Sequence, residues 1–262
     1  MRSGPICFAV WTALSLGAVL AIYPVPSAMA QGGATGEPAA AGTRVKAVLE
    51  LFTSQGCSSC PPADALLKTY ASRPDVVALT LPVDYWDYLG WKDTFANAKH
   101  SLRQKAYAKK RGDGRVYTPQ VVVNGQAHVN GGSAADIDRA IAIESAKLEA
   151  RRVGVDLRVE GHQLVIGLAG APEGSDLREA NVWLAVVQRE AEVPIKSGEN
   201  RGRTLSYVNV VRELTSIGMW SGIPQTIRID RESVAQQGAD RFAVLVQHGK
   251  GGPLLGAAIT EP

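Results

Sequence analysis

The chain has 262 residues, of which 45% are hydrophobic and 20% are charged, enough for one large or two modest domains. Its formal net charge of +3 leaves no electrostatic case for a nucleic-acid partner. The three cysteines allow at most one intramolecular disulfide, and no internal repeat is visible.

The first thirty residues have the features of a secretory signal peptide. Arg2 precedes an apolar run from Ile6 to Tyr23, and Ala28-Met29-Ala30 supplies a cleavage site of small residues. A retained membrane anchor is the alternative, but polar residues interrupt the run and no basic cluster follows it. We predict cleavage after Ala30 and an exported protein, periplasmic or secreted, with no membrane span after cleavage.

Cleavage removes Cys7, so both remaining cysteines lie in the unit Cys57-Ser58-Ser59-Cys60. Export delivers this pair to an oxidising compartment, where it forms a disulfide readily and needs a redox partner to keep it reduced.

Residues 31–42, rich in glycine, alanine and proline, are predicted to form a flexible leader. The fold is expected to start at Thr43, with a buried strand from Val45 to Phe52. Apolar spacing after the cysteines predicts a helix that closes at Arg73-Pro74, followed by a strand from Val76 to Asp84.

Phe95, Ala98, Leu102 and Ala106 predict a second helix that ends at Gly112. The next elements are two short strands around a two-residue turn and a helix that starts with a capping box: strands Gln120 to Val123 and Ala127 to Asn130, turn Asn124-Gly125, and capping residues Ser133 and Asp136. The order βαβαββα requires a parallel pair of strands with an antiparallel pair beside it, which predicts a thioredoxin-like domain over residues 43–152.

After Arg152 the pattern changes to short alternating segments separated by turn residues. We predict a smaller all-β, sandwich-like domain over residues 153–262, packed against the first. Its expected strands are Val155 to Val159, Leu164 to Leu168, Val182 to Gln188, Thr204 to Val211, Thr226 to Ile229 and Phe242 to Gln247.

A dithiol at the start of a helix is suited to thiol-disulfide exchange, because free N–H groups and the helix dipole stabilise a thiolate. In this mechanism Cys57 attacks and Cys60 resolves the mixed disulfide. Ser58 and Ser59 either donate hydroxyl hydrogen bonds to the thiolate or cap the helix, and their residue type favours capping. A static disulfide and half of a zinc site are alternatives, although the histidines show no zinc-ligand spacing.

Four segments resemble the bacterial secreted thioredoxin-like family catalogued as domain of unknown function 1223. They are ELFTSQGCSSCPPAD from Glu50, VDYWDYLGWKD from Val83, VYTPQVVVNG from Val116 and GENRGRTLSYVNVVREL from Gly198. Together they span most of the chain after the predicted leader.

The resemblance to the wider thioredoxin superfamily implies that Thr118-Pro119 is a loop with a cis proline that faces the dithiol. Glu50 also resembles, displaced by one residue, the buried acid that transfers a proton to the resolving cysteine in thioredoxins; the alternative is a solvent-facing carboxylate at the sheet edge. Gly56 and Ser58-Ser59 depart from the tryptophan and Gly-Pro of thioredoxin, which leaves the reduction potential open.

Two further segments have two interpretations each. The aromatic residues Tyr85, Trp86, Tyr88 and Trp91 form either a substrate-binding wall or the packed lid of a core, and burial habits favour the lid. The polar residues from Glu199 to Arg203 either place an arginine near the thiolate or form an ordinary hairpin loop.

The functional prediction is an exported thiol-disulfide oxidoreductase with Cys57, Cys60 and Pro119 in the catalytic site and Thr118, Glu50, Ser58 and Ser59 in support. We expect thiol or disulfide partners, a redox partner, and no cofactor or metal. One alternative is a copper(I)-handling protein, for which His128 is the histidine of interest. The other is a non-catalytic binding module stapled by the disulfide.

Overall fold

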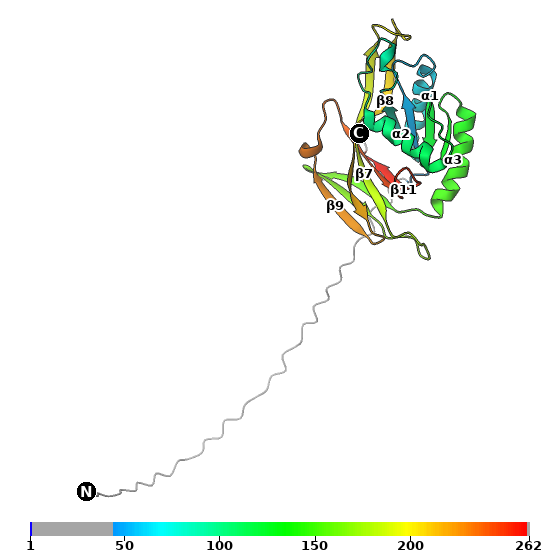
Figure 1. Cartoon of the computed structure of the whole chain (residues 1–262). Helices are drawn as coiled ribbons and strands as arrows, with labels where there is room; N and C mark the ends of the chain where they lie inside the picture. The colour runs from blue at the N-terminus through cyan, green and yellow to red at the C-terminus, as the bar shows by residue number, and fades with distance from the viewer. Residues whose placement is uncertain (2–43, 261–262) are drawn as a thin grey trace. The chain divides into compact units, whose positions relative to one another are not determined.

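The computed structural model describes residues 44–260 together with Met1 (Figure 1). Apart from Met1, the predicted signal peptide (1–30) and the predicted leader (31–42) lie outside the described residues. The described chain has a mixed α/β fold with an eight-stranded sheet and a second sheet of three strands. In this part of the chain no helix is both long enough and apolar enough to cross a membrane.

The elements up to residue 149 follow the predicted order. They are β1 (Ala47–Thr53), α1 (Pro61–Ala71), β2 (Val76–Pro82), a 3-10 turn η1 (Asp87–Leu89), α2 (Ala98–Arg111), β3 (Gln120–Val123), β4 (Ala127–Asn130) and α3 (Ala134–Glu149). β1 runs parallel to β2 and antiparallel to β3, and β3 pairs with β4. The capping box is confirmed, since the Ser133 side chain accepts a hydrogen bond from the Asp136 N–H.

Alternation along β1 places helices on both faces of the sheet. Ala47, Leu49 and Leu51 pack into one core cluster with α1 and α3. Val48 and Phe52, which point the other way, share a second cluster with Tyr107 of α2. α1 and α3 therefore cover one face and α2 the other.

The predicted apolar stripe of α2 is wrong in part. Leu102 is 63% exposed, whereas the polar residues His100, Arg103 and Gln104 are buried beside Tyr107. The reason is a buried carboxylate on β1, Glu50, which needs a cationic partner from the helix that covers it.

The remaining elements are mostly strands, and two are much longer than predicted. They are β5 (Val155–Glu160), β6 (Gln163–Leu168), β7 (Ala180–Pro194), β8 (Thr204–Trp220), β9 (Gln225–Asp230), the turn η2 (Glu232–Val234), β10 (Arg241–Gln247) and β11 (Leu254–Ile259), of which β11 was not predicted. β5, β6 and β9 form the small sheet, whose apolar side packs on β7 and β10.

β7, β8, β10 and β11 continue the sheet of β1 to β4 rather than building a sheet of their own. The strand order is β11-β10-β7-β8-β2-β1-β3-β4, and the described residues from 44 onward fall in one compact unit. The strands on the two sides of the predicted boundary near Arg152 thus share one sheet. Sequence patterns reveal strands but not their pairing, which is decided by the contact between β2 and β8.

That contact uses side chains as well as backbone. One pair, Thr80 and Val210, is in parallel register. The Thr80 hydroxyl donates to the Val208 carbonyl at 2.6 Å, and the Asn209 amide donates to the Ala78 carbonyl at 2.9 Å. Asn209 has a φ of 47°, a conformation that asparagine tolerates better than most residues. A short backbone register is thereby extended by two buried hydrogen bonds.

Candidate functional site

Cys57 and Cys60 form a disulfide between the end of β1 and the start of α1, with 5.4 Å between their Cα atoms. The loop folds back on itself, since Cys57 N–H donates to the Ser54 carbonyl and Cys60 N–H donates to the Cys57 carbonyl. Cys57 is 1% exposed and Cys60 is 0% exposed, so an incoming sulfur must displace a neighbouring group to reach either one.

The N-cap of α1 is Cys60, which makes no side-chain capping hydrogen bond. The prediction that Ser58 and Ser59 cap the helix is therefore wrong. Pro61 and Pro62 occupy the first two helical positions and have no N–H, and the N–H of Ala63 at the third position donates to the Cys60 carbonyl at 2.9 Å. The Ser59 hydroxyl instead lies 3.4 Å from the Cys57 sulfur, where it acts as the donor because a disulfide sulfur carries no proton.

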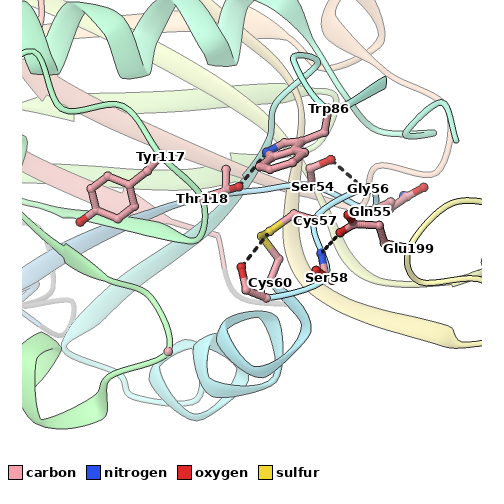
Figure 2. The surroundings of a disulfide bond; sticks show 12 residues. Ser54, Gln55, Gly56, Cys57, Ser58, Cys60, Trp86, Tyr117, Thr118 and Glu199 are labelled. Carbon is pink, nitrogen blue, oxygen red and sulfur yellow. Dashed lines mark hydrogen bonds between the residues drawn. A yellow bond between two sulfur atoms is a disulfide. The ribbon is translucent and has the colours of Figure 1, made fainter. Parts of the chain in front are cut away.

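Trp86 and Thr118 belong to the surroundings of the disulfide (Figure 2). The Trp86 indole donates to the Thr118 hydroxyl at 2.8 Å. Gly56 lets Trp86 approach, because a Cβ at position 56 would lie 3.2 Å from the Trp86 Cβ. The predicted cis bond between Thr118 and Pro119 is confirmed. Pro119 lies beside the first turn of α1, since a Cβ built on Gly131 would contact both Pro119 and Ala63.

A loop from the second half of the chain covers the other side of the cysteine loop. Asn200, which is 1% exposed, donates to the carbonyls of Gln55 at 2.9 Å and Cys57 at 3.0 Å. Glu199 accepts a hydrogen bond from the Ser58 N–H at 3.3 Å (Figure 2). The predicted hairpin loop is present, and its contacts with the cysteine loop are made by Glu199 and Asn200.

Two buried carboxyl groups that the sequence analysis missed lie near the cysteine loop. Asp64 is on α1 one turn after Cys60, and its N–H donates to the Cys60 carbonyl at 3.1 Å. Burial raises the pKa of Asp64 to about 8, the charge of Asp93 adds to the rise, and the Thr53 side chain opposes part of it. Burial also raises the pKa of Asp93 to about 6, although the Gln55 N–H donates to its carboxylate at 2.8 Å.

Asp64 is further distinguished by what surrounds it. Its two carboxyl oxygens, the Thr53 hydroxyl and the Tyr207 hydroxyl are buried without a hydrogen-bond partner among the described residues. The pKa of Tyr207 lies well above its usual value, first because of burial and then because of the charges of Asp64 and Asp93. The sequence signal that could have found Asp64 is its spacing of four from Cys60, which puts both on one helix face.

Glu50 is placed elsewhere. It is fully buried, which excludes the solvent-facing alternative. Arg103 donates to its carboxylate at 2.5 and 3.2 Å, and the Tyr107 hydroxyl donates to it as well. By the alternation along β1, Glu50 points to the face covered by α2, whereas Cys60 and Asp64 belong to α1 on the other face, so Glu50 is less suited than Asp64 to carry a proton for Cys60.

His128 and the aromatic segment complete the predicted residues. His128 Nδ1 lies 2.9 Å from the Tyr117 hydroxyl, and its Nε2 lies 3.1 Å from Asp113, so both ring nitrogens have partners. Trp86 packs against the core beneath α2, and Trp91 packs against a small cluster at the ends of β7 and β8. Tyr88 is 78% exposed, so the segment forms a packed lid with one ring left outside.

Comparison with known proteins identifies relatives without a stated activity. The family described as "Protein of unknown function (DUF1223)" matches residues 48–247. The X-ray crystal structure of a protein from Agrobacterium tumefaciens is 36% identical in sequence, covers 82% of this chain and 94% of its own, and superposes with a TM-score of 0.71. None of the curated proteins is significantly similar to the chain.

Proposed function

Because this chain belongs to the DUF1223 family of proteins of unknown function, we propose its activity from the geometry of the disulfide site. The proposal is an exported thiol-disulfide oxidoreductase that uses the Cys57–Cys60 pair. One observation carries it: the two cysteines form a disulfide at the start of a helix, with Thr118 and Trp86 in its surroundings. The buried carboxyl of Asp64 lies four residues after Cys60 on that helix.

The reaction exchanges one disulfide for another. An incoming thiolate attacks the Cys57 sulfur, the Cys57–Cys60 bond breaks, and a mixed disulfide forms between Cys57 and the partner. The electron pair of the broken bond leaves with Cys60 as a thiolate, which then takes up a proton. In the reverse direction the Cys60 thiol loses that proton and its thiolate attacks Cys57, which releases the partner thiolate.

Asp64 is the group proposed to hold this proton. It lies on the same helix face as Cys60 and is 4% exposed. With a pKa of about 8 it is mostly protonated at neutral pH while the cysteines are oxidised, so it can donate as Cys60 leaves. After donation the Asp64 carboxylate can accept the proton back during resolution.

The finer fold assignment and the location are part of the same proposal. A thioredoxin-like arrangement over residues 43–152 is supported by the parallel β1–β2 pair, the β3–β4 hairpin beside β1, and helices on both sheet faces. Export is supported by the sequence of residues 1–30, and an oxidising compartment suits a protein with a formed disulfide.

Trapping of the mixed disulfide tests the proposal. A Cys60→Ser variant keeps the attacking sulfur but cannot resolve. Its Cys57 thiolate is expected to attack disulfides of envelope proteins, releasing one partner thiolate and accumulating as a mixed disulfide with the other partner sulfur. Cys57→Ser is the matched control and should trap much less. The proposal fails if folded Cys60→Ser protein, verified by circular dichroism, captures no partner.

A double variant and a metal titration separate the two alternatives from this proposal. A binding module stapled by the disulfide predicts that replacement of both cysteines by serine lowers stability and spares function. Copper(I) handling predicts tight copper(I) binding in competition with a chelator. The position of His128 does not support copper(I) handling, because its two ring nitrogens already contact Tyr117 and Asp113.

A further inference from the structure

We propose that the loop between β7 and β8, residues 195–203, makes the reduction potential of the Cys57–Cys60 disulfide more negative through the carboxylate of Glu199. The inference rests on the proposed function, because it concerns the same two cysteines. The loop that would affect the reduction potential lies more than 130 residues away from the two cysteines in sequence.

The first support is that this loop is fixed against the cysteine loop. Asn200 donates two hydrogen bonds to carbonyls on either side of Gly56, and it is 1% exposed. A buried side-chain amide with two hydrogen-bond acceptors has little freedom to move, because a shift would leave buried polar groups without hydrogen bonds. Asn200 therefore holds its neighbour Glu199 at the cysteine loop.

The second support is that the loop is also fixed on its other side. The Ser197 hydroxyl donates to the Gly90 carbonyl at 2.6 Å, and Gly202 N–H donates to the Ile195 carbonyl at 2.9 Å. Ile195 and Tyr207 belong to a core cluster against which Trp91 packs. The position of Glu199 is thus part of the fold and does not depend on its own contact.

The third support is the shortage of N–H donors around Cys57. A thiolate is stabilised by N–H groups at a helix start, but Pro61 and Pro62 remove two of them. The Cys60 N–H donates to the Cys57 carbonyl and the Ser58 N–H donates to Glu199, which leaves the Ser59 N–H as the one donor between the two cysteines without a hydrogen-bond partner among the described residues. Glu199 therefore takes a scarce donor and adds a negative charge next to the residue that must carry the thiolate.

The direction of the change in reduction potential depends on which redox state contains the negatively charged Cys57 thiolate. A nearby carboxylate disfavours the Cys57 thiolate, which occurs only in the reduced protein. Destabilising the reduced state makes the reduction potential more negative, so the protein is a stronger reductant with Glu199 than without it. Because Glu199 is exposed, the effect should be modest and should weaken as salt is added.

The experiment equilibrates purified wild-type and Glu199→Gln protein with defined ratios of reduced and oxidised glutathione. The reduced fraction is read from the mass shift after alkylation. We expect the variant to shift the equilibrium about threefold toward the dithiol, which corresponds to about 14 mV. The pKa of the Cys57 thiol, measured from the pH dependence of the alkylation rate, should fall in the variant.

Three further variants make the result specific. Glu199→Lys should shift the equilibrium in the same direction and further, and Glu199→Asp, which keeps the charge, should stay close to the wild type. Glu192→Gln removes a charge from β7, where Glu192 contacts Ser206, and should change nothing. In about 1 M salt, where the Debye length is about 3 Å, the difference between wild type and Glu199→Gln should shrink.

An unchanged equilibrium constant in Glu199→Gln and Glu199→Lys would overturn the inference. That result leaves the proposed function standing if Cys60→Ser still traps partners. Conversely, a shifted potential in a protein that traps nothing would support the role of Glu199 and contradict the oxidoreductase proposal.

Discussion

At the scale of single residues, the two prolines after Cys60 decide which groups serve the disulfide. They remove the N–H groups of the first two helical positions, and the N–H of the third, Ala63, donates to the Cys60 carbonyl. Cys60 is an N-cap without a side-chain capping bond, and the Ser59 hydroxyl lies 3.4 Å from the Cys57 sulfur. Glu199 takes the Ser58 N–H, and Asp64 lies one turn further along the helix. The surroundings of the two cysteines thus depend on Ser59, Glu199 and Asp64.

Asp64 gives a prediction about stability and pH. Its pKa is raised from 3.8 to about 8 in the folded protein, so folding binds a proton between these values. The stabilisation that this brings is complete below about pH 4 and is lost as the pH rises through 8. Asparagine does not titrate, so the free energy of unfolding of Asp64→Asn should lack this pH dependence. Between pH 4 and pH 8 the free energy of unfolding of the wild type should fall by a few kcal/mol relative to that of the variant.

Urea unfolding of both proteins across this pH range measures the difference. Asp136→Asn is a suitable control, because the pKa of that exposed carboxyl is lowered by its hydrogen bond with Ser133. Its contribution is present at neutral pH and is lost as the pH falls below the unfolded value. Parallel pH profiles for wild type and Asp64→Asn would show that Asp64 is charged at neutral pH.

At the scale of elements, the contact between β1 and α2 is held by buried charge. Glu50 and Arg103 are both buried and form a hydrogen-bonded pair, which Tyr107 and Gln247 extend toward β10. The guanidinium also lies over the rings of Tyr107 and Trp183, at 5.0 and 5.4 Å from their centroids. This network explains why α2 buries a polar face.

Removal of one partner should be costly. We expect Arg103→Met to destabilise the protein by about 3–5 kcal/mol, because it leaves the Glu50 carboxylate buried without its counter-ion. The double variant Glu50→Leu with Arg103→Met should recover much of that loss, since no charge remains unpaired. Chemical denaturation of the single and double variants is the measurement, and equal stability of both would contradict this account.

The loop between β7 and β8 gives a second prediction at this scale. Asn200→Ala removes two buried hydrogen bonds, each worth about 1 kcal/mol, and leaves the Gln55 and Cys57 carbonyls without these donors. We expect the amides of residues 55–60 to exchange hydrogen roughly tenfold faster or more, with strands β1 and β2 little changed. Hydrogen exchange followed by mass spectrometry tests this, and uniform acceleration everywhere would indicate a global loss of stability instead.

At the scale of the whole molecule, one sheet joins the two halves of the chain. The core beneath α2 combines Val48, Phe52 and Leu79 with Ala185 and Leu245 from strands beyond residue 152. Neither half of this core is complete without the other. The large sheet also brings the loop after β7 to the cysteine loop, so the same architecture builds the core and the candidate site.

This architecture predicts that the first half does not fold by itself. A chain that ends at Arg152 should lose cooperative thermal unfolding, because the apolar residues that β7 and β10 cover would face water. Circular dichroism of the shortened and full chains during heating provides the test. A cooperative transition in the shortened chain within a few degrees of the full chain would show that the halves are independent.

Local properties of the sequence were enough to predict most of the elements up to α3. Periodicity, capping and turn residues are local properties, so the order β1 to α3, the Asn124-Gly125 turn and the position of the cysteine pair could be predicted from them. The cis bond between Thr118 and Pro119 was predicted from the resemblance to the thioredoxin superfamily. The tertiary structure decided which distant groups meet. Strand pairing across Arg152, the burial of Asp64, the pairing of Glu50 with Arg103 and the contact of Glu199 with Ser58 arise from packing between remote segments. Periodicity within one segment cannot specify such contacts, because burial and hydrogen-bond partners depend on the elements that pack against it.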